Sequence, residues 1–117
     1  RQSIERSFNF NHRRRKIKKK LKMKKKLKES DLTKEILKYL TEQGHFAYKQ
    51  WGGMFSKKGM SDIVGALHPT GTAFFLEVKV PDKEADDKQK NFLFEAEMSG
   101  AITGVVHSLD EVRKLGL

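Results

Sequence analysis

The sequence predicts an α/β fold, in which a small mixed β-sheet is flanked by helices. Apolar residues recur with helical spacing in three segments, and short apolar runs typical of strands lie between them. The order along the chain is helix, three strands, helix, strand, helix. A helix joins the third strand to the fourth, which favours a parallel pair with a right-handed crossover. The expected core is therefore α-β-β-β-α-β, and 117 residues are enough for one such domain.

The first helix is expected to begin at Ser30 or Asp31, whose side chains suit an N-cap, and to run to about Gln43. Gly44 then ends it, because glycine readily adopts the left-handed conformation that follows a helix. Its buried stripe should consist of Leu32, Ile36, Tyr39 and Leu40.

The remaining elements are short periodic runs bounded by Gly, Pro, Asp or Ser. The turn from His68 to Gly71 joins the second and third strands into a hairpin. We expect strands at residues 45–51, 62–68, 72–80 and 102–107, a second helix at 86–98, and a last helical turn or two at 108–115.

The hairpin brings acidic and basic side chains to one place. Glu77 and Lys79 lie two apart on the third strand and so share a face, and Asp62 can lie beside them at the head of the second strand. Two carboxylates and an ammonium group suit a magnesium ion, a phosphate and a water, which outlines a phosphodiesterase site. Asp62 and Glu77 would bind the metal, with the backbone carbonyl of Val78 as a further ligand. Lys79 would orient or polarise the attacking water.

Two further polar residues fit this site. Gln89 lies on the face that the second helix should bury, and a buried amide needs a partner such as a catalytic lysine or a metal-bound water. Glu35 borders the buried face of the first helix and could reach the site from there, with a second metal as one use for it.

Each residue also has a structural interpretation. A cross-strand salt bridge would explain Glu77 and Lys79, and Asp62 would simply start a strand after a turn. Gln89 would lie in a solvated first turn, and Glu35 would be an ordinary acid near a helix N-terminus. The complete set in this order is far less expected by chance than any one of its members.

The charge is unevenly distributed. The formal net charge is +10, but residues 1–30 contain 14 Lys and Arg against two Asp and Glu, whereas residues 31–117 contain 11 against 13. Residues 1–29 are therefore interpreted as a basic, flexible arm before a domain at 30–117, and the arm predicts a polyanionic partner such as DNA. Alternatively, Met23 is a natural start and residues 1–22 are foreign to the native protein. A purely electrostatic binder is a third interpretation, in which residues 31–117 alone are inactive.

Several classes of site are disfavoured by the composition. The chain has no cysteine, which removes disulfides and thiolate zinc sites, and its four histidines lack ligand spacing. No apolar stretch reaches the length of a membrane span, and no apolar core follows the basic arm as in a signal peptide.

Taken together, the motifs resemble the VRR-NUC family of the PD-(D/E)xK nuclease superfamily, whose fold is restriction-endonuclease-like. Ser61 stands where the superfamily has proline, which shapes a turn and binds no metal. The resemblance covers about residues 31–115 and rests on Gly59-x-Ser61-Asp62, Glu77-Val78-Lys79, Gln89-x-x-Phe92, Gly100 and the Val105-Val106 strand.

The resemblance implies roles for individual residues. Asp62 and Glu77 would bind Mg²⁺ or Mn²⁺, Lys79 would be catalytic, and Gln89 would support them. A glutamate of the first helix would complete the site, namely Glu35, with Glu42 on the same helix as the other candidate.

The activity implied is a metal-dependent, structure-selective DNA endonuclease, in particular a Holliday-junction (four-way junction) resolvase. Some stand-alone phage and bacterial members are similar to such resolvases and act as homodimers, which suits two symmetric cuts by sites related by a two-fold axis. The expected location is the cytoplasm of a bacterial or phage-infected cell. A less selective nickase or flap nuclease, and a non-catalytic nucleic-acid-binding module, are the alternatives.

DNA contacts are expected from residues that precede Asp62. Trp51 could stack on an unpaired base, or it could instead belong to the core or to a dimer interface. The expected contacts are Lys49, Trp51, Lys57 and Lys58.

Overall fold

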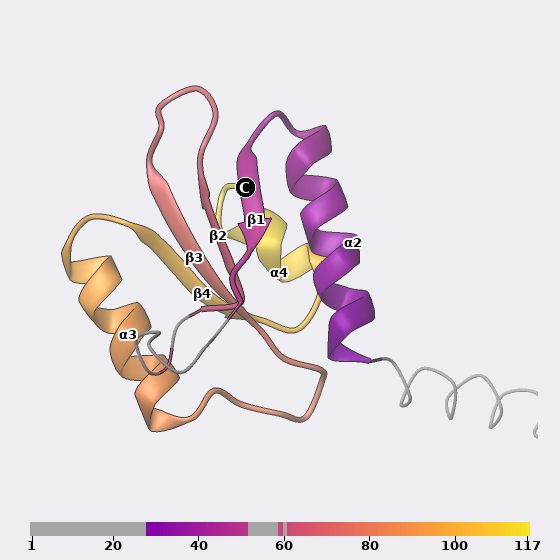
Figure 1. The fold of residues 1–117 in the computed structure, drawn as a ribbon, viewed down its shortest axis with the longest axis vertical. Helices are drawn as coiled ribbons and strands as arrows, with labels where there is room; N and C mark the ends of the chain where they lie inside the picture. Colours follow the sequence, from indigo (N-terminus) through magenta and orange to yellow (C-terminus); the bar gives the residue numbers. More distant parts are fainter. Residues whose placement is uncertain (1–27, 52–58, 60) are drawn as a thin grey trace, which may run out of the picture.

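A four-stranded mixed sheet in the order β1-β2-β3-β4 forms the centre of the fold (Figure 1). The computed structural model describes residues 28–51, 59 and 61–117, and the expected basic arm lies outside them except for its last two residues. The elements are α2 (Glu29–Glu42), β1 (Phe46–Lys49), β2 (Ile63–Ala66), β3 (Ala73–Val78), α3 (Asp87–Met98), β4 (Ile102–Val106) and α4 (Leu109–Lys114).

The strand pairing agrees with the fold expected from the sequence. β1, β2 and β3 pair antiparallel in chain order, and β4 pairs parallel to β3 after the intervening helix α3. Every expected element is present, although each strand is shorter than its apolar run suggested, by one or two residues at one or both ends.

Helix α2 begins earlier than expected. Lys28 is the N-cap and makes no side-chain capping bond, so the prediction that Ser30 or Asp31 caps the helix was wrong. The carbonyl of Lys28 instead accepts hydrogen bonds from the amides of Asp31 and Leu32, at 3.0 and 3.2 Å. Glutamate is a good helix former, so Glu29 extends the helix into the segment that the sequence assigned to the arm.

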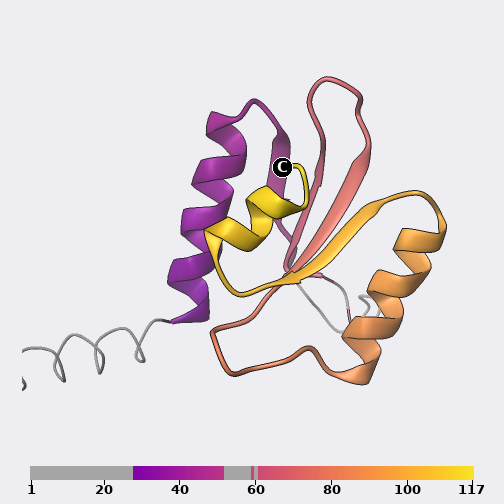
Figure 2. The ribbon, with the colours of Figure 1, turned by 180° about the vertical axis from the view of Figure 1, so that it is seen from behind.

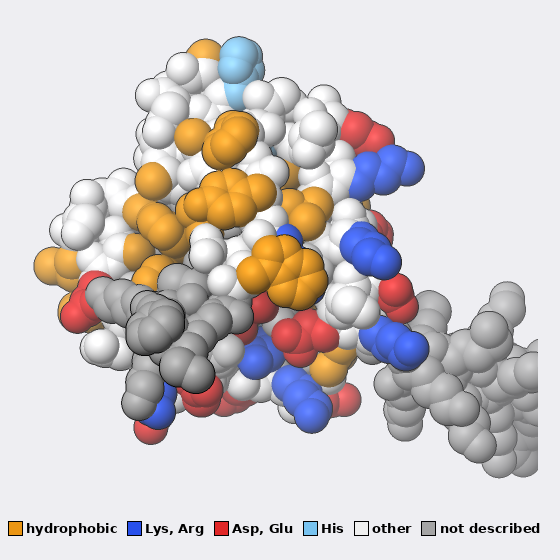
Figure 3. Space-filling model, viewed as in Figure 1, with side chains coloured by type: hydrophobic (Ala, Val, Ile, Leu, Met, Phe, Trp, Pro, Cys, Tyr) orange, Lys and Arg blue, Asp and Glu red, His pale blue; other side chains and the backbone are white. Residues whose placement is uncertain are grey.

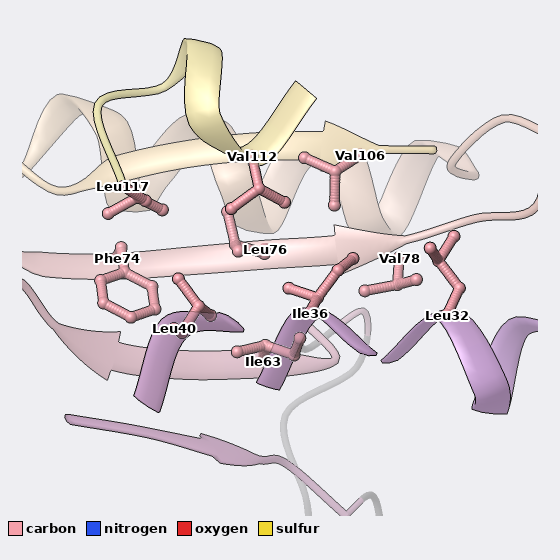
Figure 4. Packing of buried hydrophobic residues seen from close by; sticks show 10 residues of the cluster. All are labelled: Leu32, Ile36, Leu40, Ile63, Phe74, Leu76, Val78, Val106, Val112 and Leu117. Carbon is pink, nitrogen blue, oxygen red and sulfur yellow. The ribbon is translucent and has the colours of Figure 1, made fainter. Parts of the chain in front are cut away.

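The core lies between the sheet and the helices α2 and α4, which cover one face of it (Figure 2). Gly65 is required in this layer, because a side-chain carbon there would collide with the Phe46 carbonyl and the Phe74 ring. The hydroxyl of Tyr39 donates a hydrogen bond to the carbonyl of Leu117 at 3.0 Å and so joins α2 to the C-terminus. The buried cluster consists of Leu32, Ile36, Leu40, Ile63, Phe74, Leu76, Val78, Val106, Val112 and Leu117 (Figure 4).

The opposite face of the sheet is only partly covered. Helix α3 contacts β3 and β4, where Leu93 is buried and the Phe92 ring meets the Phe75 ring at 5.7 Å between centroids. Over β1 the side chains of Phe46 and Tyr48 remain exposed. This face therefore has a covered half and an open half. Among the described residues, none of the helices combines the length and the apolar character that crossing a membrane requires.

Candidate active site

The antiparallel pairing of β2 and β3 brings Asp62 next to Glu77. Ile63 lies opposite Leu76, so the residue before Ile63 lies opposite the residue after Leu76. Oδ2 of Asp62 accepts a hydrogen bond from the amide of Val78 at 2.8 Å, which holds the carboxylate against the end of β3. The sequence-based placement of Asp62 across the hairpin is confirmed.

Glu77 is a buried acid whose two oxygens have different surroundings. Its side chain is 1% exposed, and Oε1 accepts a hydrogen bond from Nε2 of Gln89 at 2.7 Å and lies 3.7 Å from Nζ of Lys79. Oε2 is buried without any hydrogen-bond partner among the described residues. Burial, followed by the negative charge of Asp62, raises the pKa of Glu77 to about 8, and Lys79 lowers it only in part. The positive charge of Lys79 therefore does not fully offset the negative charge of the site.

A third carboxylate comes from the first turn of α2. Oxygen atoms of Glu29, Asp62 and Glu77 all lie within 4.8 Å of one another. The carbonyl of Glu29 also accepts a hydrogen bond from the Thr33 hydroxyl at 2.8 Å, one turn further along the helix. These three carboxylates are called the acidic trio below.

The structure does not place Glu35 in the trio. Glu35 is exposed on α2, and six residues of an α-helix turn it about 120° away from the face that carries Glu29. Glu42 is also exposed, at the far end of the helix. Glu29 could have been found from the sequence, because it shares its helical face with Leu32 and Ile36; assigning it to the arm concealed this spacing.

Gln89 occupies a first-turn position and also reaches the acidic trio. Asp86 is the N-cap of α3, and its Oδ1 accepts from the amide of Gln89 at 2.8 Å, while Oε1 of Gln89 accepts from the amide of Asp86 at 2.9 Å. This capping box fixes the amide group, so that its nitrogen is directed at Oε1 of Glu77. The sequence allowed two interpretations of Gln89, a residue of a first helical turn and a polar partner of the site. Each of them describes part of its environment.

The acidic trio has the donor set for a divalent cation. Magnesium and manganese prefer oxygen ligands, and a cation here would give Oε2 of Glu77 a partner and offset the charge of three carboxylates. Lys79 lies at the edge of the trio, and its amide donates to the Val106 carbonyl at 3.0 Å, which fixes its backbone beyond the end of β3. The residues therefore fit a metal ion, with the Val78 carbonyl remaining a predicted ligand.

A comparison with solved structures identifies the fold. The chain is similar to a structure described as "VRR_NUC domain", with a TM-score of 0.62 and 27% sequence identity, over 74% of this chain and 91% of that one. The fold is therefore that of a VRR-NUC domain. No protein-family model matches the sequence, and no curated protein matches it either. The structural match supports a nuclease-family domain with a mixed sheet flanked by helices.

Ser61, which is compared with the superfamily's proline in the sequence analysis, lies directly before Asp62 and β2. It is 2% exposed, and its hydroxyl donates to the Ile63 carbonyl at 3.4 Å, so a side chain of this size closes the turn before β2.

Two of the four residues expected to contact DNA lie within the described part of the VRR-NUC domain. Trp51 is 75% exposed, which excludes the core interpretation, and Nζ of Lys49 lies 4.3 Å from the centre of its ring. Lys57 and Lys58 lie outside the described residues.

Proposed function

We propose that this protein is a metal-dependent DNA endonuclease that cuts branched DNA, with the four-way junction as the expected substrate. The observation that supports this best is the acidic trio beside a lysine, with a buried carboxylate oxygen that has no hydrogen-bond partner in the described part of the chain. A structural salt bridge between Glu77 and Lys79 would explain neither the two further carboxylates nor the raised pKa of Glu77.

In this proposal Asp62 and Glu77 bind Mg²⁺ or Mn²⁺ and Glu29 takes the role that the resemblance gave to Glu35. When bound, the ion supplies charge neutralisation at the phosphate and lowers the pKa of a bound water. Nζ of Lys79 donates hydrogen bonds to the attacking water or to a phosphate oxygen, and its positive charge offsets the charge that develops there. Gln89 holds Oε1 of Glu77 and thereby leaves Oε2 for the cation.

A homodimer is part of the proposal, because paired symmetric cuts across a four-way junction need two active sites related by a two-fold axis. A less selective flap nuclease is the second candidate. It is favoured by the exposed aromatic side chains of Phe46 and Tyr48, which lie on the same sheet face as Asp62 and Glu77.

Cleavage of end-labelled four-way junction, flap, nicked and linear duplex DNA with Mg²⁺ or Mn²⁺ tests the proposal. We expect paired cuts in the junction and their loss in Glu77→Ala and Lys79→Ala. Glu29→Ala should lower the rate at least ~10-fold, whereas Glu35→Ala, an exposed glutamate of the same helix, should leave it near that of the wild type.

The outcomes separate the interpretations. Cutting of flaps but not junctions would keep the site and change the substrate. A folded protein that cuts none of these DNAs with either metal would be a nucleic-acid-binding module, and the endonuclease proposal would fail. Equal losses in Glu29→Ala and Glu35→Ala would contradict the role given to Glu29.

A further inference from the structure

The sheet face that carries Asp62 and Glu77 also carries an aromatic side chain of the edge strand β1. In the register of the sheet, Tyr48 lies opposite Val64, and Val64 lies opposite Phe75. Asp62 and Glu77 form a row on the same face, two residues further along their strands. Because two residues of a strand span about 7 Å, the Tyr48 row lies about 7 Å from the row of the two carboxylates.

A second aromatic ring lies on β1 beyond Tyr48, further from the two carboxylates. Phe46 occupies the next row on the same face, about 13 Å from the carboxylate row by the same spacing, and its ring lies 5.9 Å from that of Tyr48. At the other end of β1, the amide of Gln50 donates to the Asp62 carbonyl at 2.7 Å, and Trp51 follows directly. Phe46, Tyr48 and Trp51 are called the aromatic track below.

The aromatic track is open to solvent. Phe46, Tyr48 and Trp51 are 68%, 46% and 75% exposed, since α3 covers only the β3–β4 half of this face. Figure 3 shows hydrophobic side chains gathered over β1 and β2, with acidic and basic side chains directly beyond one end of the band. Large apolar groups gathered in this way mark an interaction surface rather than ordinary surface scatter.

We propose that the aromatic track binds an unpaired stretch of DNA and leads it into the acidic trio. This rests on the proposed endonuclease and names its substrate class: branched DNA with a single-stranded segment next to the cut. Aromatic rings stack on any base and so suit a strand of any sequence. Lys49 lies over Trp51 and Lys79 lies in the site, which places positive charge for the strand's phosphates at the end of the track nearest the carboxylates.

A second copy of the chain is the competing occupant of this surface. Phe46 and Tyr48 of the track share a sheet face with Asp62 and Glu77, and Tyr48 lies one row from these two carboxylates. A protein seated on Tyr48 and Trp51 would therefore crowd the entrance that a DNA strand needs. This adjacency favours nucleic acid as the occupant and leaves a dimer interface to another part of the molecule.

Trp51 provides a direct readout, because it is the single tryptophan of the chain. The intact protein is titrated in EDTA, where no cleavage occurs, with oligothymidine or with duplex DNA of equal length. We expect single-stranded DNA to quench Trp51 fluorescence and to bind more tightly than the duplex does. Tyr48→Ala and Phe46→Ala should each weaken single-strand binding ~5- to 100-fold, the size of one base–ring stack, and leave duplex affinity nearly unchanged.

Two controls separate stacking from loss of structure. Tyr48→Phe keeps a ring and should retain binding. Phe94→Ala removes a ring of similar exposure, 58%, from α3 outside the track and should have no effect.

Unchanged single-strand affinity in Tyr48→Ala and Phe46→Ala would overturn the inference. So would sedimentation showing a dimer that Tyr48→Ala dissociates, since the track would then be an interface between copies. Because binding is measured without metal, the result is independent of cleavage. If the protein cuts DNA but single-stranded DNA does not quench Trp51 fluorescence, the inference about the aromatic track fails and the endonuclease proposal stands. If the fluorescence is quenched but no DNA is cut, the endonuclease proposal fails and the inference about the track stands.

Discussion

At the residue scale, Glu77 links the stability of the fold to the proposed metal site. Its pKa is raised from 4.5 to about 8, so the folded protein binds a proton that the unfolded chain releases. The stabilisation from that proton is complete below a pH of about 4.5 and is lost as the pH rises through about 8. Above that range the fold holds a buried carboxylate whose charge Lys79 offsets only in part.

We therefore expect the thermal midpoint of the wild type in EDTA to fall between pH 5 and 9, and Mg²⁺ to restore it at the alkaline end. Glu77→Gln is neutral at every pH, so its midpoint should change less over this range and respond little to Mg²⁺. Glu35→Gln, at an exposed position of α2, should follow the wild type. Parallel curves for the wild type and Glu77→Gln would show that Glu77 does not titrate in this window.

The residues of the trio differ in how far the sequence could predict them. Asp62 and Glu77 follow from strand alternation, which is a local rule. Predicting Glu29 would have required the exact start of α2. The expected cap at Ser30 or Asp31 placed Glu29 outside the helix and so excluded it. The unpartnered state of Oε2 depends on how tightly α2, β2 and β3 meet, which spacing along the chain does not encode.

At the element scale, helix α3 positions Gln89 through its N-terminal capping box. Asp86→Ala removes the cap and should lower the free energy of unfolding by about 1 kcal/mol. It also releases the Gln89 amide that holds Oε1 of Glu77, so cleavage per folded molecule should fall. Urea unfolding and single-turnover cleavage measure the two effects separately.

Ser108→Ala is the matched control. The Ser108 hydroxyl accepts from the amide of Glu111 at 3.3 Å and caps α4, a helix that lies away from the Gln89–Glu77 hydrogen bond. This variant should lose a similar amount of stability and keep its cleavage rate. If both variants lost activity equally, the capping box would matter only for stability.

Element order and pairing were predictable because they depend on periodicity and on turn residues that lie close together in the sequence. The parallel β3–β4 pair follows from the helix between them. The ends of elements were less predictable, as β1 at Phe46–Lys49 shows: its apolar run continues to Trp51, but the chain leaves the sheet before that ring. Hydrogen bonding with β2 sets that limit, and it is a property of the partner strand.

At the scale of the whole molecule, the sheet separates stability from function. One face packs against α2 and α4 as the core, and the other carries Asp62 and Glu77 of the acidic trio and, on its open half, Phe46 and Tyr48 of the aromatic track. The sequence alone left Trp51 between a core and a surface role, because a tryptophan suits both. Only the arrangement of α3 over β3 and β4 shows which half of this face remains open.

The charge of the molecule is divided in the same way, since the domain from residue 31 onward is nearly balanced and the basic excess precedes it. Residues 1–22 contain ten Lys and Arg and one Glu. Deleting them should weaken duplex binding and reduce the log–log salt dependence by ~0.9 for each phosphate that the protein no longer neutralises, because fewer counterions are released. Fluorescence anisotropy over a range of NaCl concentrations measures this slope.

Stacking on the aromatic track depends little on salt, so quenching of Trp51 by saturating single-stranded DNA should survive the deletion. An unchanged slope would show that this segment neutralises no phosphates, whereas loss of quenching at saturation would show that the track acts only together with the arm.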